Sequence, residues 1–190
     1  MAFRIVSIGD SVIWGQGLLP DEKFNTLVRQ ALPGGATLES AAHSGAVIGA
    51  TGATGTPQPG EVPASRLSII EQCDAYANSP DTVDLVLMNG GINDVGVANI
   101  LNPFAVIPPL ETRVAHACHD GMLVLLKKVS AKFSKPACKI LVTGYYPILS
   151  ALSDPLGVTK LLSLFGIAVP PFVDKDLGFI NPVLHRCEVF

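Results

Sequence analysis

Short apolar runs alternate with segments in which apolar residues recur every three or four positions, along the first three quarters of the chain. Largely apolar runs occur at Phe3–Ile8, Val83–Met88 and Lys139–Thr143, and each ends directly before a glycine or an asparagine. A fourth, more polar stretch at Ala36–Ala41 is a weaker candidate. Apolar runs of this length between turn residues are typical of strands that are buried in a parallel sheet. The pattern therefore predicts four strands, of which Ala36–Ala41 is the weakest.

Helical spacings fill the segments between these runs. Lys23–Leu32 carries apolar residues three or four positions apart, and Pro33-Gly34-Gly35 ends it. Arg66–Tyr76 and Leu110–Phe133 show the same spacing, which predicts one short and one long helix, whereas Ser44–Pro63 is rich in glycine and proline and predicts a loop. The side chains expected to face the core are Leu67, Ile70 and Cys73 in the short helix and Leu110, Val114, Ala117, Met122, Leu125 and Val129 in the long one.

Strands that alternate with helices predict an α/β fold with three layers, α/β/α, around a mostly parallel sheet. In such sheets ligands bind beyond the carboxyl ends of the strands. Polar and glycine-rich clusters follow three of the predicted strands: Gly9-Asp10-Ser11, His43-Ser44-Gly45 and Asn89–Asp94. We therefore expect these clusters to form one shared site.

The composition is that of an ordinary globular domain. The chain has 190 residues, of which 48% are apolar and 15% are charged, and its net charge is −3. This balance excludes a disordered chain, which needs few apolar residues and a high net charge. It also excludes a nucleic-acid partner, because no basic excess is present to neutralise phosphates. We interpret residues 1–190 as a single domain.

The sequence predicts neither a membrane span nor a secretory signal. Mean hydropathy is +0.43, yet the best candidate for a span, Leu161–Val173, is broken by Gly166, Pro170 and Pro171. A spanning helix needs about 20 apolar residues in succession. The amino terminus reaches Asp10 too early for a secretory signal. Either the chain is cytoplasmic or a leader was removed beforehand, and we expect a cytoplasmic protein.

The cysteines do not suggest a metal site. They lie far apart and form no C-x-x-C pair: Cys73, Cys118, Cys138 and Cys187. In a chain of this size such cysteines are expected to be buried thiols rather than metal ligands or a disulfide framework. We expect no metal and no organic cofactor.

Three residues at the predicted strand ends carry candidate chemistry for acyl transfer. Ser11, in a loop with one helical turn, can present a hydroxyl nucleophile, or it can simply cap that turn. Asn93 can donate its side-chain amide to an oxyanion, or it can form a local Asx-turn. Gly45 offers an unscreened backbone N–H, or it is an ordinary loop glycine. Their combination at neighbouring strand ends favours an active site.

The same residues resemble a known family. Gly9-Asp10-Ser11, Gly45 and Gly91-Ile92-Asn93-Asp94 are similar, in order, to the first three signature blocks of the SGNH (GDSL-type) hydrolases. The resemblance covers about the first half of the chain by motif. It implies a flavodoxin-like fold and hydrolysis of a small-molecule ester by a serine esterase or lipase. Ser11 would be the nucleophile, and the N–H groups of Ser11 and Gly45 and the Asn93 side chain would form the oxyanion hole.

The fourth block of that family, Asp-x-x-His, does not occur in this sequence. The histidines present are His43, His116, His119 and His185. One explanation is that the domain lacks its C-terminal part, so that the base lies beyond Phe190, and this is the explanation we favour. The other is that His185 acts as the base, although Pro182 occupies the position of an orienting carboxylate. The alternative function is a non-catalytic binding domain or pseudoenzyme that keeps the pocket without a base.

Overall fold

The computed structural model describes residues 2–50, 67–96, 100, 107–145 and 154–164. The chain divides into two compact units, residues 1–94 with 115–144 and residues 95–114 with 145–190. The first unit contains the whole of the described sheet together with Ser11, Gly45 and Asn93.

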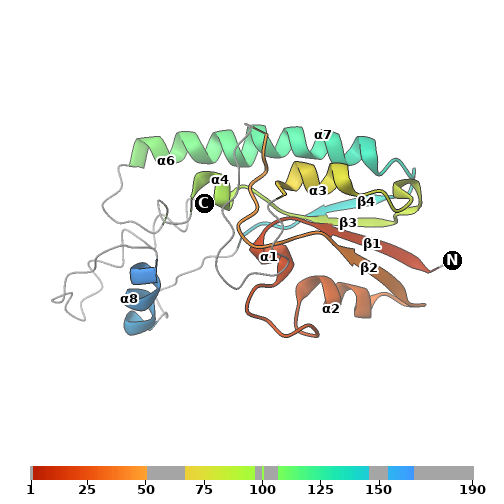
Figure 1. The fold of residues 1–190 in the computed structure, drawn as a ribbon, viewed down its shortest axis with the longest axis horizontal. Helices are drawn as coiled ribbons and strands as arrows, with labels where there is room; N and C mark the ends of the chain where they lie inside the picture. Colours follow the sequence, from red (N-terminus) through yellow and green to blue (C-terminus); the bar gives the residue numbers. More distant parts are fainter. Residues whose placement is uncertain (1, 51–66, 97–99, 101–106, 146–153, 165–190) are drawn as a thin grey trace. The chain divides into compact units, whose positions relative to one another are not determined.

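The described strands form one four-stranded parallel sheet, as the sequence predicts. They are β1 (Phe3–Ile8), β2 (Ala36–Ser40), β3 (Leu85–Met88) and β4 (Lys139–Val142). The order across the sheet is β2-β1-β3-β4, and every neighbouring pair is parallel (Figure 1). β1 therefore lies between β2 and β3.

Helices cover both faces of this sheet, which confirms the three-layer α/β/α architecture. The helices α1 (Ser11–Trp14) and α2 (Phe24–Ala31) lie on one face, and α3 (Ile69–Ala75) and α7 (Met122–Lys132) lie on the other (Figure 1). Successive strand residues point to opposite faces. One core contains Ile5, Leu38, Leu87, Ile13 and Val28, and the other contains Val6, Ile8, Val86, Met88, Ile69, Cys73, Leu125 and Val129.

The predicted long helix differs from the sequence-based expectation in its bounds and its winding. Helical structure begins with α6 (Ile107–Val114), continues through a π-helical segment, η2 (Ala115–Gly121), and ends with α7. A π-helix places hydrogen bonds five residues apart and changes which side chains share a face. Of the six residues expected to face the core, Val114 and Met122 are only half-buried.

The helix predicted at Arg66–Tyr76 starts later than expected. Ser68 is the N-cap of α3, and a reciprocal capping box joins it to Glu71. Leu67 therefore precedes the helix and is 38% exposed, so its predicted place in the core is wrong, and Ile69 is buried instead.

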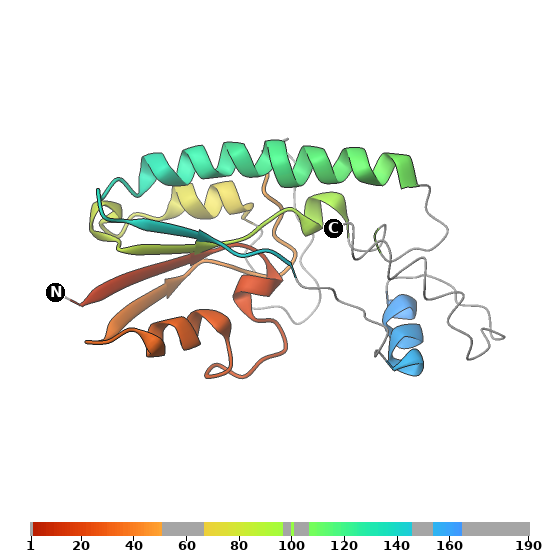
Figure 2. The same ribbon diagram turned by 180° about the vertical axis from the view of Figure 1, so that it is seen from behind.

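In the described part of the chain, the strand predicted to be buried at Lys139–Thr143 lies at the edge of the sheet and is partly exposed. Among the described residues, β4 pairs with β3 alone, and Figure 2 shows the two strands side by side from behind. Leu141 and Val142 are 45% and 41% exposed as a result. An apolar run alone does not distinguish a central strand from an edge strand, because burial depends on the neighbours.

The remaining described elements are short. They are the 3₁₀ turn η1 (Pro80–Thr82), α4 (Ile92–Val95) and α8 (Pro155–Leu164). No helix in the described part of the chain has the length and apolarity that crossing a membrane requires.

The described cysteines Cys73, Cys118 and Cys138 carry free thiols, and Cys73 is buried as expected while the other two are half-buried. Burial raises the pKa of all three thiols above the usual value, which favours the protonated form. Cys187 lies outside the described residues.

Candidate active site

Ser11 begins the short helix that follows the central strand. β1 ends at Ile8, Gly9 takes a φ of +149°, and α1 starts at Ser11. The cap of this helix is Asp10, whose carboxylate accepts a hydrogen bond from the backbone N–H of Val12 at 2.9 Å. Ser11 is therefore not the N-cap. Its half-buried hydroxyl has no hydrogen-bond partner among the described residues.

The turn that carries Ser11 is held by buried polar side chains from two other elements. Asn89, directly after β3, donates to the Asp10 carboxylate at 2.7 Å and accepts from the Asp10 backbone N–H at 3.0 Å. Gln72 of α3 accepts from the Gly9 N–H at 2.8 Å and donates to the Gly9 carbonyl at 3.1 Å. Both backbone groups of Gly9 are thus satisfied, which fixes the end of β1.

Gly45 lies in the buried loop that follows β2. It adopts a left-handed φ of +72°, which glycine tolerates without steric cost. The loop is tied to the segment after β1 by two hydrogen bonds. The His43 N–H donates to the Gly9 carbonyl at 3.2 Å, and the Ser44 hydroxyl donates to the Gln16 side chain at 2.6 Å.

Asn93 lies in α4, beyond the end of β3. Its side-chain amide donates to the carbonyl of Ala46 at 2.9 Å. This partner lies 47 positions away in the sequence, so the bond is not that of a local Asx-turn. Because a primary amide has two N–H groups, a second donor remains after this bond is made.

The three candidate residues thus follow three adjacent strands. Ser11 follows β1, and Gly45 and Asn93 follow its neighbours β2 and β3. Asn93 also contacts the residue next to Gly45. That the Ser11 hydroxyl, the Gly45 N–H and the Asn93 amide face one crevice stays a prediction.

None of the described histidines is placed as a base for Ser11. Each ring nitrogen of the buried His43 lies against a backbone carbonyl rather than against Ser11, at 2.8 Å from the Ser44 carbonyl and 2.6 Å from the Leu67 carbonyl. The other two described histidines are exposed on η2 and bond to Asp120: His116 and His119. His185 lies outside the described residues.

The described part of the chain offers no group of three His, Cys, Asp or Glu side chains that could hold a metal ion.

One carboxylate of the strand-end region has an unusual environment. Asp94, in α4, accepts a backbone hydrogen bond from Ile48 at 2.9 Å, and burial raises the pKa of this carboxyl above the ordinary value.

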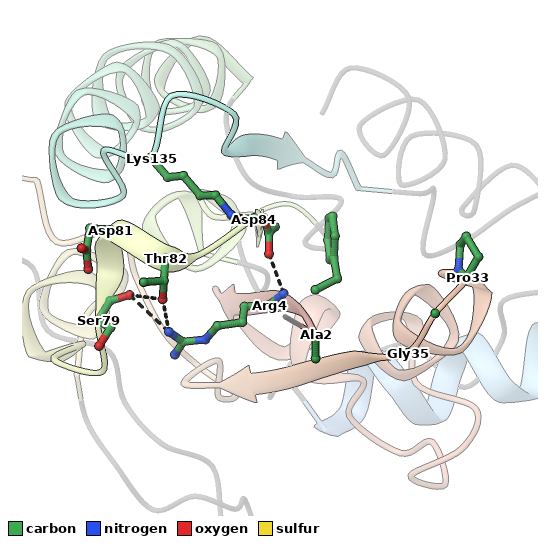
Figure 3. Close-up of a pocket in the computed structure, with 11 residues that line it drawn as sticks. Ala2, Arg4, Pro33, Gly35, Ser79, Asp81, Thr82, Asp84 and Lys135 are labelled. Atoms are coloured by element: carbon green, nitrogen blue, oxygen red, sulfur yellow. Dashed lines mark hydrogen bonds and ion pairs between the residues drawn. The ribbon is translucent and has the colours of Figure 1, made fainter.

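A groove of about 810 Å³ lies at the opposite, amino ends of the strands (Figure 3). The Arg4 guanidinium bonds there to the Ser79 carbonyl at 3.3 Å and to the Thr82 hydroxyl. Asp84 accepts a bond from the Arg4 N–H at 2.9 Å and one from Lys135. Because the Lys135 ammonium pairs with Asp84 and the Arg4 guanidinium pairs with Glu39 at 2.9 Å, we assign the groove a structural role.

No protein-family model and no curated protein matches this chain. Solved structures do. A phospholipase A1 from Streptomyces albidoflavus NA297 aligns with a TM-score of 0.58 and 16% identity, over 100% of this chain and 72% of that one. An extracellular lipase from Streptomyces rimosus aligns with a TM-score of 0.55 and 17% identity, over 99% of this chain and 72% of the lipase.

The chain has the α/β/α fold of these two enzymes. The similar structures also include AlinE4, an SGNH-hydrolase family esterase, with a TM-score of 0.43, 17% identity and coverage of 94% of this chain and 80% of the esterase. The fold assignment rests on the two Streptomyces structures.

Within this α/β/α fold, several side chains near the strand ends make contacts that the sequence does not predict. Asn89 and Asp94 lie in a polar cluster that the sequence places at a strand end, so their position was a usable signal. Gln72 gave no such signal, because a glutamine in a predicted amphipathic helix is ordinarily exposed. It is buried here, and the oxygen and the nitrogen of its side-chain amide both bond to the backbone of Gly9.

Proposed function

We propose that this chain hydrolyses carboxylic esters through an acyl-enzyme formed on Ser11. The Ser11 oxygen attacks the ester carbonyl as a base removes its proton, and the alcohol leaves with a proton. Water then attacks the acyl-enzyme and regenerates the serine. The N–H groups of Ser11 and Gly45 and the Asn93 side chain stabilise the oxyanion in both steps.

The observation that carries this proposal is the strand order β2-β1-β3. The nucleophile follows the central strand, and an oxyanion donor follows each flanking strand. Acyl transfer needs donors beside the nucleophile rather than at a distance from it, because they must reach the same developing tetrahedral centre. The fold shared with a phospholipase A1 and a lipase supports the same reaction class.

We propose that the base comes from outside the described residues. We favour a residue beyond Phe190, and His185 is the alternative within this sequence. Both ring nitrogens of His43 are engaged by carbonyl groups, and the two described histidines on η2 bond to Asp120.

A non-catalytic binding domain is the second candidate function. It is favoured by one observation: among the described histidines, none forms a hydrogen bond to Ser11. A serine site without a base still keeps an activity of about 10³–10⁴ over water from its oxyanion hole and binding. Weak turnover alone therefore does not separate the two functions, whereas covalent labelling of the serine does.

The experiment combines a fluorophosphonate label with hydrolysis of p-nitrophenyl acetate and butyrate. We expect mass spectrometry to locate the label on Ser11, and we expect Ser11→Ala to abolish both labelling and turnover. Ser134→Ala, at an exposed serine, is the matched control and should change neither. Loss of turnover in His185→Ala would identify that residue as the base.

Three outcomes separate the candidates. Hydrolysis that survives Ser11→Ala contradicts the serine mechanism. A chain that is labelled at Ser11 but turns over weakly, with no effect of His185→Ala, places the base beyond Phe190. Absence of both labelling and turnover favours the binding domain.

The partner and the compartment of the chain remain predictions. We propose a small-molecule ester as the substrate and the cytoplasm as the location. Fractionation of cells that produce the protein from its natural gene tests the location directly.

A further inference from the structure

We propose that Asp94 is a positioning residue that holds the Gly45 loop beside Asn93 and so keeps the oxyanion donors in register. This inference rests on the proposed function. It goes further by assigning a role to a carboxylate that the proposed reaction does not use.

Two consecutive side chains of α4 bond to the same loop. Asn93 donates to the Ala46 carbonyl at 2.9 Å. Asp94 accepts from the Ile48 N–H, at 2.9 Å to one carboxylate oxygen and 3.2 Å to the other, and the Gly49 N–H also bonds to it. Asn93 thus bonds to a backbone carbonyl of the loop, and Asp94 bonds to backbone N–H groups of the same loop.

The other side of the loop is held by the start of α3. The Ile69 N–H donates to the Val47 carbonyl at 2.8 Å, and the Ile70 N–H donates to the Ile48 carbonyl at 3.1 Å. Removal of the Asp94 carboxylate leaves these bonds in place. We therefore expect the loop to shift on its α4 side rather than to unfold.

The electrostatics of Asp94 favour a positioning role over a stabilising one. Burial raises the pKa of this carboxyl, and the charge of Asp10 raises it further. Burial raises the pKa of the Cys118 thiol, and the charge of Asp94 raises it further. A carboxyl with a raised pKa in the folded state adds no stability by ionising at neutral pH. The cost in stability comes from burial of the carboxylate, and the hydrogen bonds from the loop offset part of it.

A displaced Gly45 N–H affects the transition state more than the bound substrate. Oxyanion donors act where charge develops, so their loss lowers kcat and leaves KM nearly unchanged. Loss of one complete donor costs about 10²–10³ in kcat. A donor that is displaced rather than removed should cost less, about 10- to 100-fold.

The test compares Asp94→Asn and Asp94→Glu with the unchanged protein, using p-nitrophenyl butyrate at pH 7. Asparagine keeps the volume but can accept through one oxygen only. We expect kcat to fall about 10- to 100-fold in Asp94→Asn and KM to change less than about threefold. Asp94→Glu keeps both acceptor oxygens on a longer side chain and should recover part of kcat.

Asp84→Asn is the matched control, because Asp84 also accepts a backbone N–H but lies at the amino ends of the strands. It should lower the melting temperature and leave kcat unchanged. Asp94→Asn should show the reverse, a small change in melting temperature with a large loss of kcat. An unchanged kcat in Asp94→Asn overturns the inference, and so does a loss of kcat that parallels loss of folded protein.

Amide hydrogen exchange tests the loop contact even if the chain is not an esterase. We expect Asp94→Asn to speed exchange at Ile48 and Gly49 and to leave exchange at Ile70 unchanged. Equal protection at Ile48 and Gly49 in both proteins overturns the inference whatever the activity. Faster exchange in a chain without label at Ser11 supports the loop contact while the proposed function fails.

Discussion

Asn89 and Asp10 are joined by a pair of hydrogen bonds between the ends of neighbouring strands. The Asn89 amide donates to the Asp10 carboxylate at 2.7 Å, and the Asp10 N–H donates to the Asn89 side-chain oxygen at 3.0 Å. The same Asp10 carboxylate caps α1 through Val12. One buried pair therefore joins β3 to the turn that presents Ser11.

Replacement of Asn89 by alanine should destabilise the fold. The change leaves the buried Asp10 carboxylate and N–H without this partner, which costs about 1–3 kcal/mol and more for a charged group. Urea denaturation measures the loss. Asn78→Ala, at an exposed asparagine that bonds to Glu39, is the control and should cost less than about 1 kcal/mol. Equal losses in the two variants would contradict the structural importance of the pair.

Gly9→Ala should damage the same pair by steric overlap. A Cβ on Gly9 would lie 2.1 Å from the Asn89 side-chain oxygen, at a φ of +149°. Gly34→Ala is the control, because Gly34 has a positive φ but no atom within 4 Å of the added carbon. We expect about 1–2 kcal/mol of backbone strain in Gly34→Ala and a clearly larger loss in Gly9→Ala. Thermal unfolding of both variants distinguishes overlap from strain.

Two leucines of α7 provide a test of the core. Leu125 is fully buried between α7 and the sheet, whereas Leu123 is 45% exposed. Leu125→Ala should lower the free energy of unfolding by about 2–5 kcal/mol. Leu123→Ala, in the same helix, should change it by about 0.5 kcal/mol or less. Similar values for both would show that α7 does not pack as described.

The stability of the chain should depend on the ionisation of Asp84. The hydrogen bond from Lys135, followed by the one from the Arg4 N–H, lowers the pKa of Asp84 below its ordinary 3.8. A lowered pKa in the folded state adds stability above the ordinary pKa, and this stability is lost as the pH falls through the lowered value. The free-energy difference between the unchanged protein and Asp84→Asn should therefore be largest near pH 7 and shrink below about pH 4. A difference that does not vary with pH would contradict this assignment.

The local pattern of the sequence determined the four strands and the helices between them. Phe3–Ile8 is a strand with the bounds that its apolar run predicts, and the other three strands differ by one or two residues at an end. Such agreement is expected where apolar spacing and turn residues indicate the same element. The sequence also determined where the candidate motifs lie, because each motif comes shortly after a predicted strand.

Hydrogen bonds over long sequence separations decided the rest of the site. Asp10 and Asn89 are 79 positions apart, and Asp94 and Ile48 are 46 apart. The spacing of these residues along the chain does not predict that they are in contact. The order of the strands in the sheet brings them together. The role of the serine was likewise open in the sequence, and the bond from the Val12 N–H to Asp10 excludes Ser11 as the cap.

Burial of β4 and the winding of the long helix also required the tertiary structure. The run at Lys139–Thr143 is apolar enough for a central strand, yet β4 has β3 as its one described neighbour and Leu141 is exposed. The π-helical segment Ala115–Gly121 packs closely against the strand-end loops. Cys118 lies next to Gly91, and Gly121 lies next to Ile48. Hydrophobic periodicity thus determined which segments are strands and helices. Their neighbours in space decided which faces are buried, because burial depends on packing between segments that are far apart in the chain.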